Sequence, residues 1–386
     1  MEIRAPRDDA EIEALAKVLS ASFLFTPEDA TSWIEAAKPE NARVLIDGAV
    51  VAGLITLPMG QFFGGRRVPM TGLAAVGVLP ELRGRGLATA LVKGVLADLA
   101  RRGVAISALY PSTLSLYRAL GWEIAGSRWE IKLDPRLLEA SDHTVPMRRV
   151  GTDDVLGIRA AHLQRARLLP GAIDRHPFLW DRVLAPRGQA AEGYVIGDES
   201  VDGYVFFQRE SRDRGHFDLH VTDLAVNDEA TANRLLAFFA DMGTLCDKVW
   251  WRGHPDDTVL AAMVDRHWSV RQVDPWMLRI VDMAAAFATR GWPAGFDADV
   301  ELDVCDVEID ANHGRWIASW LDGQVTLTRG GEGRVRVDIR ALAALFTGHK
   351  SPGQLAATGL LEGEDRDLAR LATAFAGPMP TMWDGF

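Results

Sequence analysis

Hydrophobic and polar positions follow two different periods along the first third of the chain. From Asp8 to Ser20, and again from Pro27 to Ala36, apolar side chains recur at helical spacing, so both segments predict amphipathic helices. Extended apolar runs separated by Asp47-Gly48 and Gly64-Gly65 predict three meandering strands, at residues 42–46, 49–57 and 68–78. A helix, a strand, a short helix and a last strand are then predicted at residues 84–102, 104–110, 113–120 and 123–133.

The same order of elements recurs between residues 146 and 282, which indicates two diverged copies of one fold. The second copy predicts helices at 152–167, 177–184, 229–246 and 258–264, and strands at 194–196, 203–209, 217–226, 248–252 and 276–281. The corresponding strand-to-helix junctions read VGVLPELRGRGLATAL and LAVNDEATANRLLAFF. Only the first has glycines at its turn, so we expect only the first copy to be active.

The remainder of the chain has a third pattern. A helical stretch at 283–290 precedes a break, and short alternating runs joined by Asp-Gly and Gly-Gly predict an antiparallel sheet: VELDV, GRWIASWL, QVTLTR and RVRVDI. Three helices are predicted next, in ALAALFTG, SPGQLAATG and DRDLARLATAFA. The final PTMWDGF is too short and too rich in proline and glycine for a helix.

Composition and charge narrow the function classes. With 386 residues, 48% of them apolar and 25% charged, the chain can fill more than one core. The acidic N-terminus does not resemble a signal peptide, and we expect a cytoplasmic protein without a membrane partner. A net charge of −11 disfavours nucleic acid and favours cationic small molecules. Cys246 and Cys305 have no partner spacing, and His216 and His220 have no ligand motif around them, so no metal is predicted.

The strongest chemical signal is the segment RGRGLA, from Arg83 to Ala88. It follows an apolar strand and opens a helix, so free backbone N–H groups and the positive end of the helix dipole converge there. Gly84 and Gly86 would let a ligand approach the backbone, as in a pyrophosphate cradle. The spacing fits neither a dinucleotide fingerprint nor a P-loop. A plain surface loop is the alternative from the residues alone.

A family resemblance supports the cradle. The pattern R-x-x-G-x-A at Arg83, Gly86 and Ala88, after VGV and before LATALVKGVLADLARRG, resembles the acyl-CoA motif of the GNAT superfamily of N-acetyltransferases. Two such copies followed by a sterol-carrier-like segment, DIRALAALFTGHKSPGQLAATGLL, look like the Eis (enhanced intracellular survival) family. The implied fold is α/β (α+β), with a catalytic GNAT domain, a degenerate GNAT domain and a sterol-carrier-like domain, at residues 1–135, 136–282 and 283–386.

The resemblance also implies roles for individual residues. In such enzymes a tyrosine at the place of Tyr117 protonates the CoA sulfur, and the terminal carboxylate, here that of Phe386, reaches the active site and takes part in removing the amine proton. The acetyl-CoA contacts fall on Val76, Val78, Arg83, Gly84, Arg85, Gly86, Leu87, Ala88 and Ser112. Each role has a structural alternative: core strand residues, a ring packed on the sheet, or a frayed tail.

The resemblance is weaker for the residues that would bind the acceptor amine. Phe23, Trp33 and Ala75 match the region that binds the amine, while Leu24-Phe25 replaces the polar character expected there, and Ala75 stands where the family has a bulky aromatic. We therefore expect an acetyl-CoA-dependent enzyme that acetylates primary amines of multi-amine substrates such as aminoglycosides by direct transfer, without a cysteine intermediate. Acetylation of protein lysines is the alternative within this class. A protein that binds a lipid or another small molecule with its C-terminal domain is the alternative outside it. The resemblance implies a homohexamer.

Overall fold

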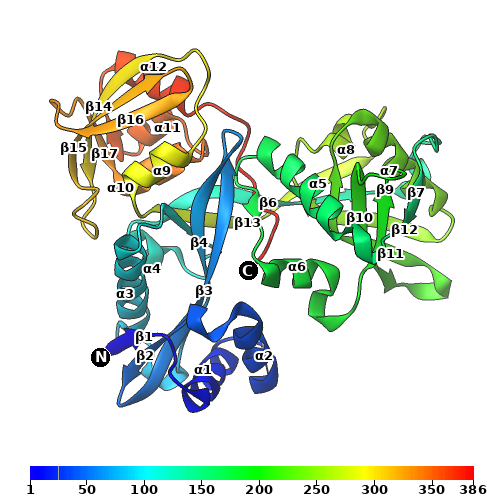
Figure 1. The fold of residues 1–386 in the computed structure, drawn as a ribbon, viewed down its shortest axis with the longest axis horizontal. Coiled ribbons are helices and arrows are strands. Elements are labelled where there is room, and N and C mark those ends of the chain that lie inside the picture. The colour runs from blue at the N-terminus through cyan, green and yellow to red at the C-terminus, as the bar shows by residue number, and fades with distance from the viewer. Residues whose placement is uncertain (25) are drawn as a thin grey trace. The chain divides into compact units, whose positions relative to one another are not determined.

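The computed structural model describes residues 1–24 and 26–386, so Phe25 lies outside the described residues. The chain forms two compact units. Unit 1 contains Met1–Gly126, Pro275–Pro380 and Phe386, and unit 2 contains Ser127–Asp274 and Thr381–Gly385. The chain passes from one unit to the other inside two strands, β6 (Glu123–Leu133) and β13 (Trp268–Ile280). Figure 1 shows the elements in chain order.

The N-terminal part of unit 1 is a twisted sheet with the strand order β1-β2-β3-β4-β5-β13. Its strands, apart from β13, are β1 (Glu2–Arg4), β2 (Ala42–Asp47), β3 (Ala49–Phe63), β4 (Arg66–Val78) and β5 (Ile106–Leu109). β2, β3 and β4 are antiparallel neighbours, whereas β4 and β5 run parallel. The helices are α1 (Asp9–Ser22), α2 (Pro27–Ala37), α3 (Leu87–Arg101) and α4 (Leu114–Ala119). The predicted meander and the helices around it are therefore confirmed, while β1 was not predicted.

The last strand of this sheet comes from a distant part of the sequence. Residues Met277–Ile280 of β13 pair antiparallel with β5, with Met277 opposite Leu109 and Ile280 opposite Ile106. The hydrophobic pattern predicts this strand at 276–281, in the second copy, but does not show that it completes the sheet of the first copy. β13 is also longer than expected, since it begins at Trp268.

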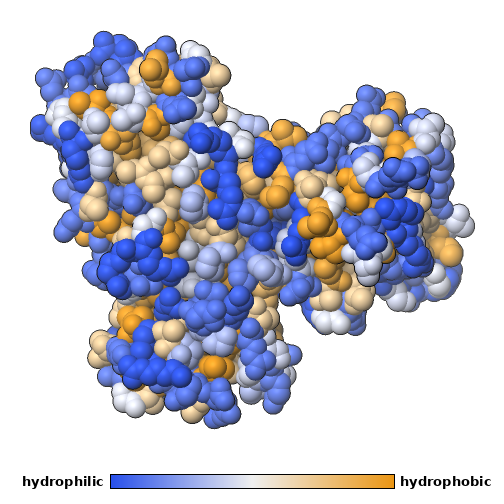
Figure 2. Space-filling view, in the orientation of Figure 1, coloured by the Kyte–Doolittle hydropathy of each residue, from blue (hydrophilic) through white to orange (hydrophobic). Residues whose placement is uncertain are grey.

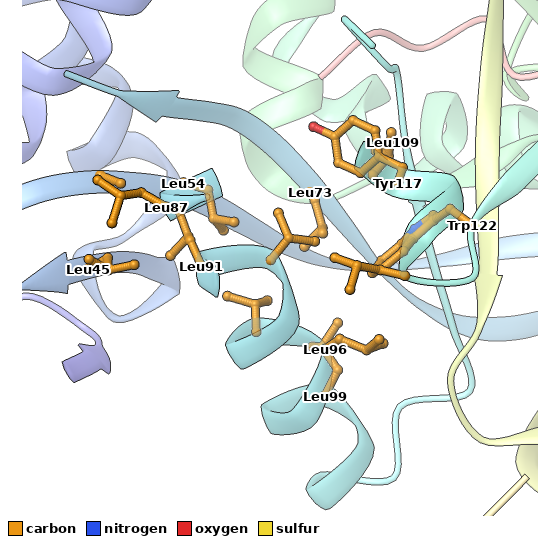
Figure 3. Close-up of a cluster of buried hydrophobic side chains, with 14 of the residues drawn as sticks. Leu45, Leu54, Leu73, Leu87, Leu91, Leu96, Leu99, Leu109, Tyr117 and Trp122 are labelled. Atoms are coloured by element: carbon orange, nitrogen blue, oxygen red, sulfur yellow. The ribbon is translucent and has the colours of Figure 1, made fainter. Parts of the chain in front are cut away.

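A continuous apolar core joins α3 to the sheet. Leu91, Val92, Val95, Leu96 and Leu99 of α3 are at most 2% exposed, because their spacing places them on one helical face. Burial of such a side chain stabilises the fold by about 1.5–3 kcal/mol. Figure 3 shows these leucines beside those of β2, β3 and β4, with Tyr117 and Trp122 closing one side of the cluster.

The C-terminal part of unit 1 has its own sheet, with the order β16-β15-β14-β17-β18. Its strands are β14 (Ala298–Cys305), β15 (Gly314–Leu321), β16 (Gln324–Arg329), β17 (Val335–Asp338) and β18 (Leu361–Glu362), and its helices are α9 (Met283–Thr289), α10 (Ile339–Phe346), α11 (Pro352–Ala357) and α12 (Asp365–Ala374). The prediction of an antiparallel sheet was wrong at one place, since β17 runs parallel to β14. The β15–β16 hairpin lies between them in the sequence and acts as the crossover that parallel pairing requires.

The C-terminal part contacts the first sheet within unit 1, chiefly through its helices α9 and α10. The amide of Gly291 donates to the carbonyl of Phe63 at 3.0 Å, at the tip of the long β3–β4 hairpin, and the rings of Phe63 and Phe346 meet edge to face at 5.4 Å. Figure 1 shows that hairpin reaching α9 and α10. A fully buried ion pair, Arg279 to Asp306 at 2.6 Å, joins β13 to the segment after β14.

Unit 2 repeats the architecture, with the strand order β6-β12-β11-β10-β9-β7. Its other strands are β7 (Met147–Arg149), β9 (Glu192–Ile196), β10 (Gly203–Ser211), β11 (Phe217–Val226) and β12 (Cys246–Gly253), and its helices include α5 (Val155–Leu168), α6 (Pro177–Leu184), α7 (Glu229–Asp241) and α8 (Thr258–Ala261). The predicted helix 229–246 was too long. The chain turns after Met242, with the amide of Leu245 bonded to its carbonyl, so Cys246 starts a strand.

The surface agrees with the composition. Figure 2 shows hydrophilic residues over most of the visible face, with hydrophobic ones in small scattered patches. Among the residues that the structure describes, every helix is too short or too polar to cross a lipid bilayer.

Candidate active site

The predicted cradle lies between β4 and α3. Gly84 and Gly86 have φ of +78° and +76°, a left-handed conformation that glycine adopts without strain. For this reason α3 begins at Leu87, three residues later than predicted. Gly86 is the N-cap of α3, and no side chain caps the helix. A β-carbon on either glycine would meet nothing within 4 Å. The first-turn amides of α3 are thus open to an anion.

The residues around the cradle differ in exposure. Arg83 and Arg85 are exposed and could reach phosphate oxygens, whereas Leu87 is buried in the core and Ala88 is partly buried. The Nε of Arg83 lies 3.4 Å from the carbonyl of Val78. A bound anion would therefore find positive charge on the two arginines and fixed amide positions in the backbone at 86–88.

A β-bulge interrupts β4 directly before the cradle. Gly53 pairs with Gly77 and Ile55 with Ala74, so Leu54 of β3 stands opposite both Ala75 and Val76. Ala75 has a φ of +49°, which is unusual for a residue with a side chain. Bulges of this kind redirect backbone groups near active sites.

The two central strands part next to this bulge. The parallel ladder between β4 and β5 runs from Met70–Ile106 to Gly72–Ala108 and ends there. Beyond this point the β5 side of residues 73–78 has no ladder partner within the described sheet. The side chains of Val76 and Val78 pack on the core. Their backbone groups on the β5 side are not needed for this packing. The structure thus brings a gap between strands, a bulge and an uncapped helix into one region of unit 1.

Tyr117 lies in α4 and is 3% exposed. Its ring packs edge to face on Trp122, with the centroids 6.3 Å apart. Burial disfavours the phenolate and raises the pKa of Tyr117 to about 12. Figure 3 shows its hydroxyl directed away from the leucines of α3. Ser112, which precedes α4, is exposed.

The C-terminal residue lies at the point where β4 and β5 part. The ring of Phe386 packs against Gly72, the last β4 residue in the ladder, and meets the ring of Tyr110 edge to face at 5.9 Å. Sequence reasoning singled out Phe386 but missed Gly72 and Tyr110. Tyr110 directly follows β5, whereas Gly72 lies in the middle of β4, so no local pattern in the sequence distinguished Gly72.

The residues predicted to bind the acceptor amine lie on different elements of unit 1. Phe23 is the C-cap of α1 and is 36% exposed, and the hydroxyl of the preceding Ser22 donates to the carbonyl of Val78 at 3.3 Å. The end of α1 is therefore beside the end of β4. Leu24 is exposed. Trp33 is partly buried in the middle of α2, the helix that packs on α1.

The matching junction of the second copy is chemically different. Asp228 caps α7, and its carboxylate accepts from the amide of Thr231 at 2.8 Å. A carboxylate of the chain itself thus occupies the helix end that a phosphate would need, and its charge repels a second anion. The start of α3 therefore suits an anion better than the start of α7 does.

Neither cysteine lies near the candidate site in the sequence. Cys246 is buried at the start of β12, and burial raises the pKa of its thiol to about 11. Cys305 ends β14. A thiol kept protonated in this way is a poor nucleophile, so Cys246 does not suit a covalent acetyl intermediate.

Comparisons with known proteins agree with this geometry. Residues 2–125 and 171–280 each match an acetyltransferase (GNAT) domain, and residues 283–383 match a sterol carrier protein domain. A GCN5-related N-acetyltransferase from Anabaena variabilis is 32% identical over the full length of both chains, with a TM-score of 0.94. The chain therefore belongs to the GCN5-related N-acetyltransferases, enzymes whose GNAT domains imply acetyl-CoA as co-substrate.

More specific likenesses define the domain arrangement. Eis1 from Mycobacterium abscessus shares the fold over the whole of both chains, with a TM-score of 0.84 at 24% identity. The predicted Eis-like order of GNAT, GNAT and sterol-carrier-like domains is thus confirmed. An uncharacterized N-acetyltransferase of Streptomyces avermitilis is 27% identical, in a match that spans 91% of this chain and 89% of that protein.

Proposed function

We propose that this enzyme transfers acetyl from acetyl-CoA directly to primary amines of multi-amine substrates, of which aminoglycosides are representative. The observation that carries the donor half is the uncapped start of α3, with two left-handed glycines in open space. Backbone amides 86–88 would bind the diphosphate, with Arg83 and Arg85 beside it, and Ser112 would contact the cofactor. The backbone of Val76 and Val78, next to the bulge, would hold the acetyl carbonyl and the pantetheine arm.

The proton transfers are assigned to two groups. The amine nitrogen attacks the thioester carbonyl, a C–N bond forms, and the C–S bond breaks with the electron pair leaving on sulfur. Tyr117 then gives the sulfur its proton, which a phenol protonated at neutral pH can do. The carboxylate of Phe386 stabilises the ammonium and takes its proton through water. The packing of the Phe386 ring on Gly72 and Tyr110 supports this role.

The acceptor class rests on charge and on the local departures from the family. A chain with a net charge of −11 attracts polycations. Phe23, Trp33 and Ala75 would line the acceptor side, and the small Ala75 at the bulge leaves room for a bulky amine. Following the Eis resemblance, we also propose a homohexamer, which analytical ultracentrifugation tests directly.

A thiol-release assay tests the proposal. Kanamycin, tobramycin, a polyamine and a lysine peptide are each offered with acetyl-CoA, and released CoA is measured against time. We expect turnover with the multi-amines and a lower kcat/KM for the peptide. A higher kcat/KM for the peptide would assign the enzyme to protein lysines instead. No thiol release with any amine would overturn the proposed acceptor class.

A further inference from the structure

Tyr117 is followed by a tight turn that joins α4 to β6. The carbonyl of Tyr117 accepts from the amides of Leu120 and Trp122, both at 3.0 Å, and the ring of Trp122 packs on that of Tyr117. Figure 3 shows these two aromatic side chains on the same side of the core. The backbone of residues 120–122 is thus bonded directly to the proposed proton donor, so a shift of this turn moves Tyr117 as well.

The end of α4 is also held by an ion pair of its own. Arg118 donates to the carboxylate of Glu123 through Nε at 3.0 Å and through Nη2 at 2.6 Å, and this carboxylate accepts from the amide of Ile124 at 2.9 Å. Glu123 is the first residue of β6 and is 8% exposed. The charged, two-point contact makes α4, the turn and the start of β6 one connected piece.

The guanidinium of Arg279, from β13, lies against this turn. Gly121 has a φ of +90°, and a β-carbon on it would stand 2.7 Å from Nε and 2.8 Å from Cζ of Arg279. Arg279 is 0% exposed, and its Nε has no hydrogen-bond partner among the residues that the structure describes. A buried N–H group without a partner costs free energy, so stability alone does not account for an arginine at this place.

The C-terminal part of unit 1 fixes Arg279. Its Nη2 donates to Oδ1 of Asp306 at 2.6 Å. The same oxygen of Asp306 accepts from the amides of Glu308 and Ile309, both at 3.1 Å, and its other oxygen accepts from Nδ2 of Asn312 at 3.0 Å. Ile309 is buried in the core that α3 also forms. The segment after β14 therefore gives the guanidinium one orientation beneath the turn.

We propose that Arg279 and Asp306 are positioning residues for Tyr117, and that the sterol-carrier-like part of the chain thereby supports the candidate active site. We call these two residues the brace. Because the brace contacts the turn at Gly121, it acts on Tyr117 through that turn. All of these contacts lie within unit 1. The inference rests on the proposed role of Tyr117 as the proton donor.

The first test displaces the turn from the brace in the full-length enzyme. Gly121→Ala places a methyl group on the guanidinium of Arg279, and because Asp306 holds that guanidinium, the turn has to move. We expect kcat to fall by about 10- to 100-fold, the effect of a small misplacement of a catalytic group. The KM for acetyl-CoA should stay within about twofold, because the cradle is unchanged. An unchanged kcat would overturn the inference.

A matched control separates the brace from backbone strain. Gly48, between β2 and β3, has a φ of +77°, and a β-carbon on it would meet nothing within 4 Å. Gly48→Ala therefore introduces a similar left-handed strain without a clash. It should leave kcat unchanged. An equal fall in kcat for Gly48→Ala and Gly121→Ala would make strain alone responsible, and the inference would be wrong.

The second test asks whether the C-terminal part acts through Tyr117. Asp306→Ala releases the guanidinium of Arg279 and should lower kcat as Gly121→Ala does, at a temperature at which circular dichroism shows the variant folded. In a Tyr117→Phe background, either change should add little to the loss, because both act through one group. A full further loss would indicate general damage to the fold and would contradict the brace. Should Asp306→Ala fail to fold, Asp306→Asn replaces it with the same expectations.

The same variants distinguish this inference from the proposed function. If Tyr117→Phe leaves kcat unchanged, Tyr117 is not the proton donor, and the inference is overturned together with that role. If Tyr117→Phe lowers kcat but Gly121→Ala and Asp306→Ala do not, the proton donor stands and only the brace fails.

Discussion

The phenyl ring of Phe386 lies so close to the Cα of Gly72 that a β-carbon on residue 72 would stand 2.7 Å from Cε2 of the ring. Gly72 is also the last residue of β4 that pairs with β5. A glycine at this position therefore makes room for the last residue of the chain at the point where the two strands part.

Gly72→Ala should consequently displace the ring of Phe386. The added methyl group would also lie 2.9 Å from Cε of Met59, so the ring has to move. We expect kcat to fall by about 10-fold or more, with the Kd for CoA unchanged. Steady-state kinetics and calorimetric titration measure the two quantities. Gly353→Ala, where a β-carbon meets nothing within 4 Å, serves as the control and should leave both unchanged.

Gly86→Ala should weaken binding of the cofactor. The substitution puts a side chain on a residue with a φ of +76° and places a methyl group where the diphosphate would approach the backbone. We expect the Kd for CoA to rise by about 10-fold or more, which corresponds to about 1.4 kcal/mol. Gly103→Ala provides the matched control, since its φ of +65° at the other end of α3 gives a similar strain in equally open space. An equal rise in Kd for both variants would argue against the cradle.

Tyr117→Phe should lower kcat by about 10²- to 10⁴-fold while retaining CoA binding, because it removes a proton donor and little volume. Burial raises the pKa of Tyr117 to about 12, so the phenol stays protonated through the whole neutral and mildly alkaline range. Its proton would be lost only as the pH approaches 12. The pH dependence of kcat between pH 6 and 10 should therefore have the same shape in both enzymes. A limb in this range that disappears in the variant would contradict the burial argument.

Each chain should bind one CoA. The start of α3 is uncapped, whereas the carboxylate of Asp228 already caps α7. Calorimetric titration should give a stoichiometry near one per chain. Gly86→Ala should change this single event, and Asp228→Ala should leave it intact. Two binding events per chain would show that the second junction is also functional.

The buried pair of Arg279 and Asp306 should matter for stability more than any exposed pair. Both side chains are 0% exposed, and Asp306 also accepts from the amides of Glu308 and Ile309 at 3.1 Å. Asp306→Ala leaves a buried guanidinium without a counter-charge and should lower the free energy of unfolding by about 3–5 kcal/mol. Urea denaturation measures this change. Glu332→Ala, which breaks an exposed contact with Arg334, should cost at most about 1 kcal/mol.

The sequence predicted local structure well and long-range pairing poorly. Helical spacing predicted the bounds of α1, α2 and α6 to within about two residues, because a few neighbouring positions determine their apolar faces and caps. Hydrophobic patterns do not encode partners, so the antiparallel prediction failed for β14 and β17, and the pairing of β13 with β5 was not foreseen.

The residues of the candidate site also differ in whether the sequence alone could reveal them. The cradle at Arg83–Ala88 could be recognised because glycines and arginines stand together in one turn. Tyr110 and Gly72 could not be recognised, since their importance depends on a residue more than 270 positions later in the chain that only folding brings to them. The contact between Arg175 and Asp384 could not be predicted for the same reason, because the two residues are 209 positions apart in the sequence.

β13 completes the first sheet, and this limits how the protein can be divided into fragments. A fragment that ends near residue 135 would lack Met277–Ile280 and leave the backbone of β5 unpaired along one side. Exposed edges of this kind favour aggregation. The part of the chain that holds the candidate site is therefore not a self-sufficient module, and gene fusions or deletions that separate it from residues 275–280 remove one of its strands.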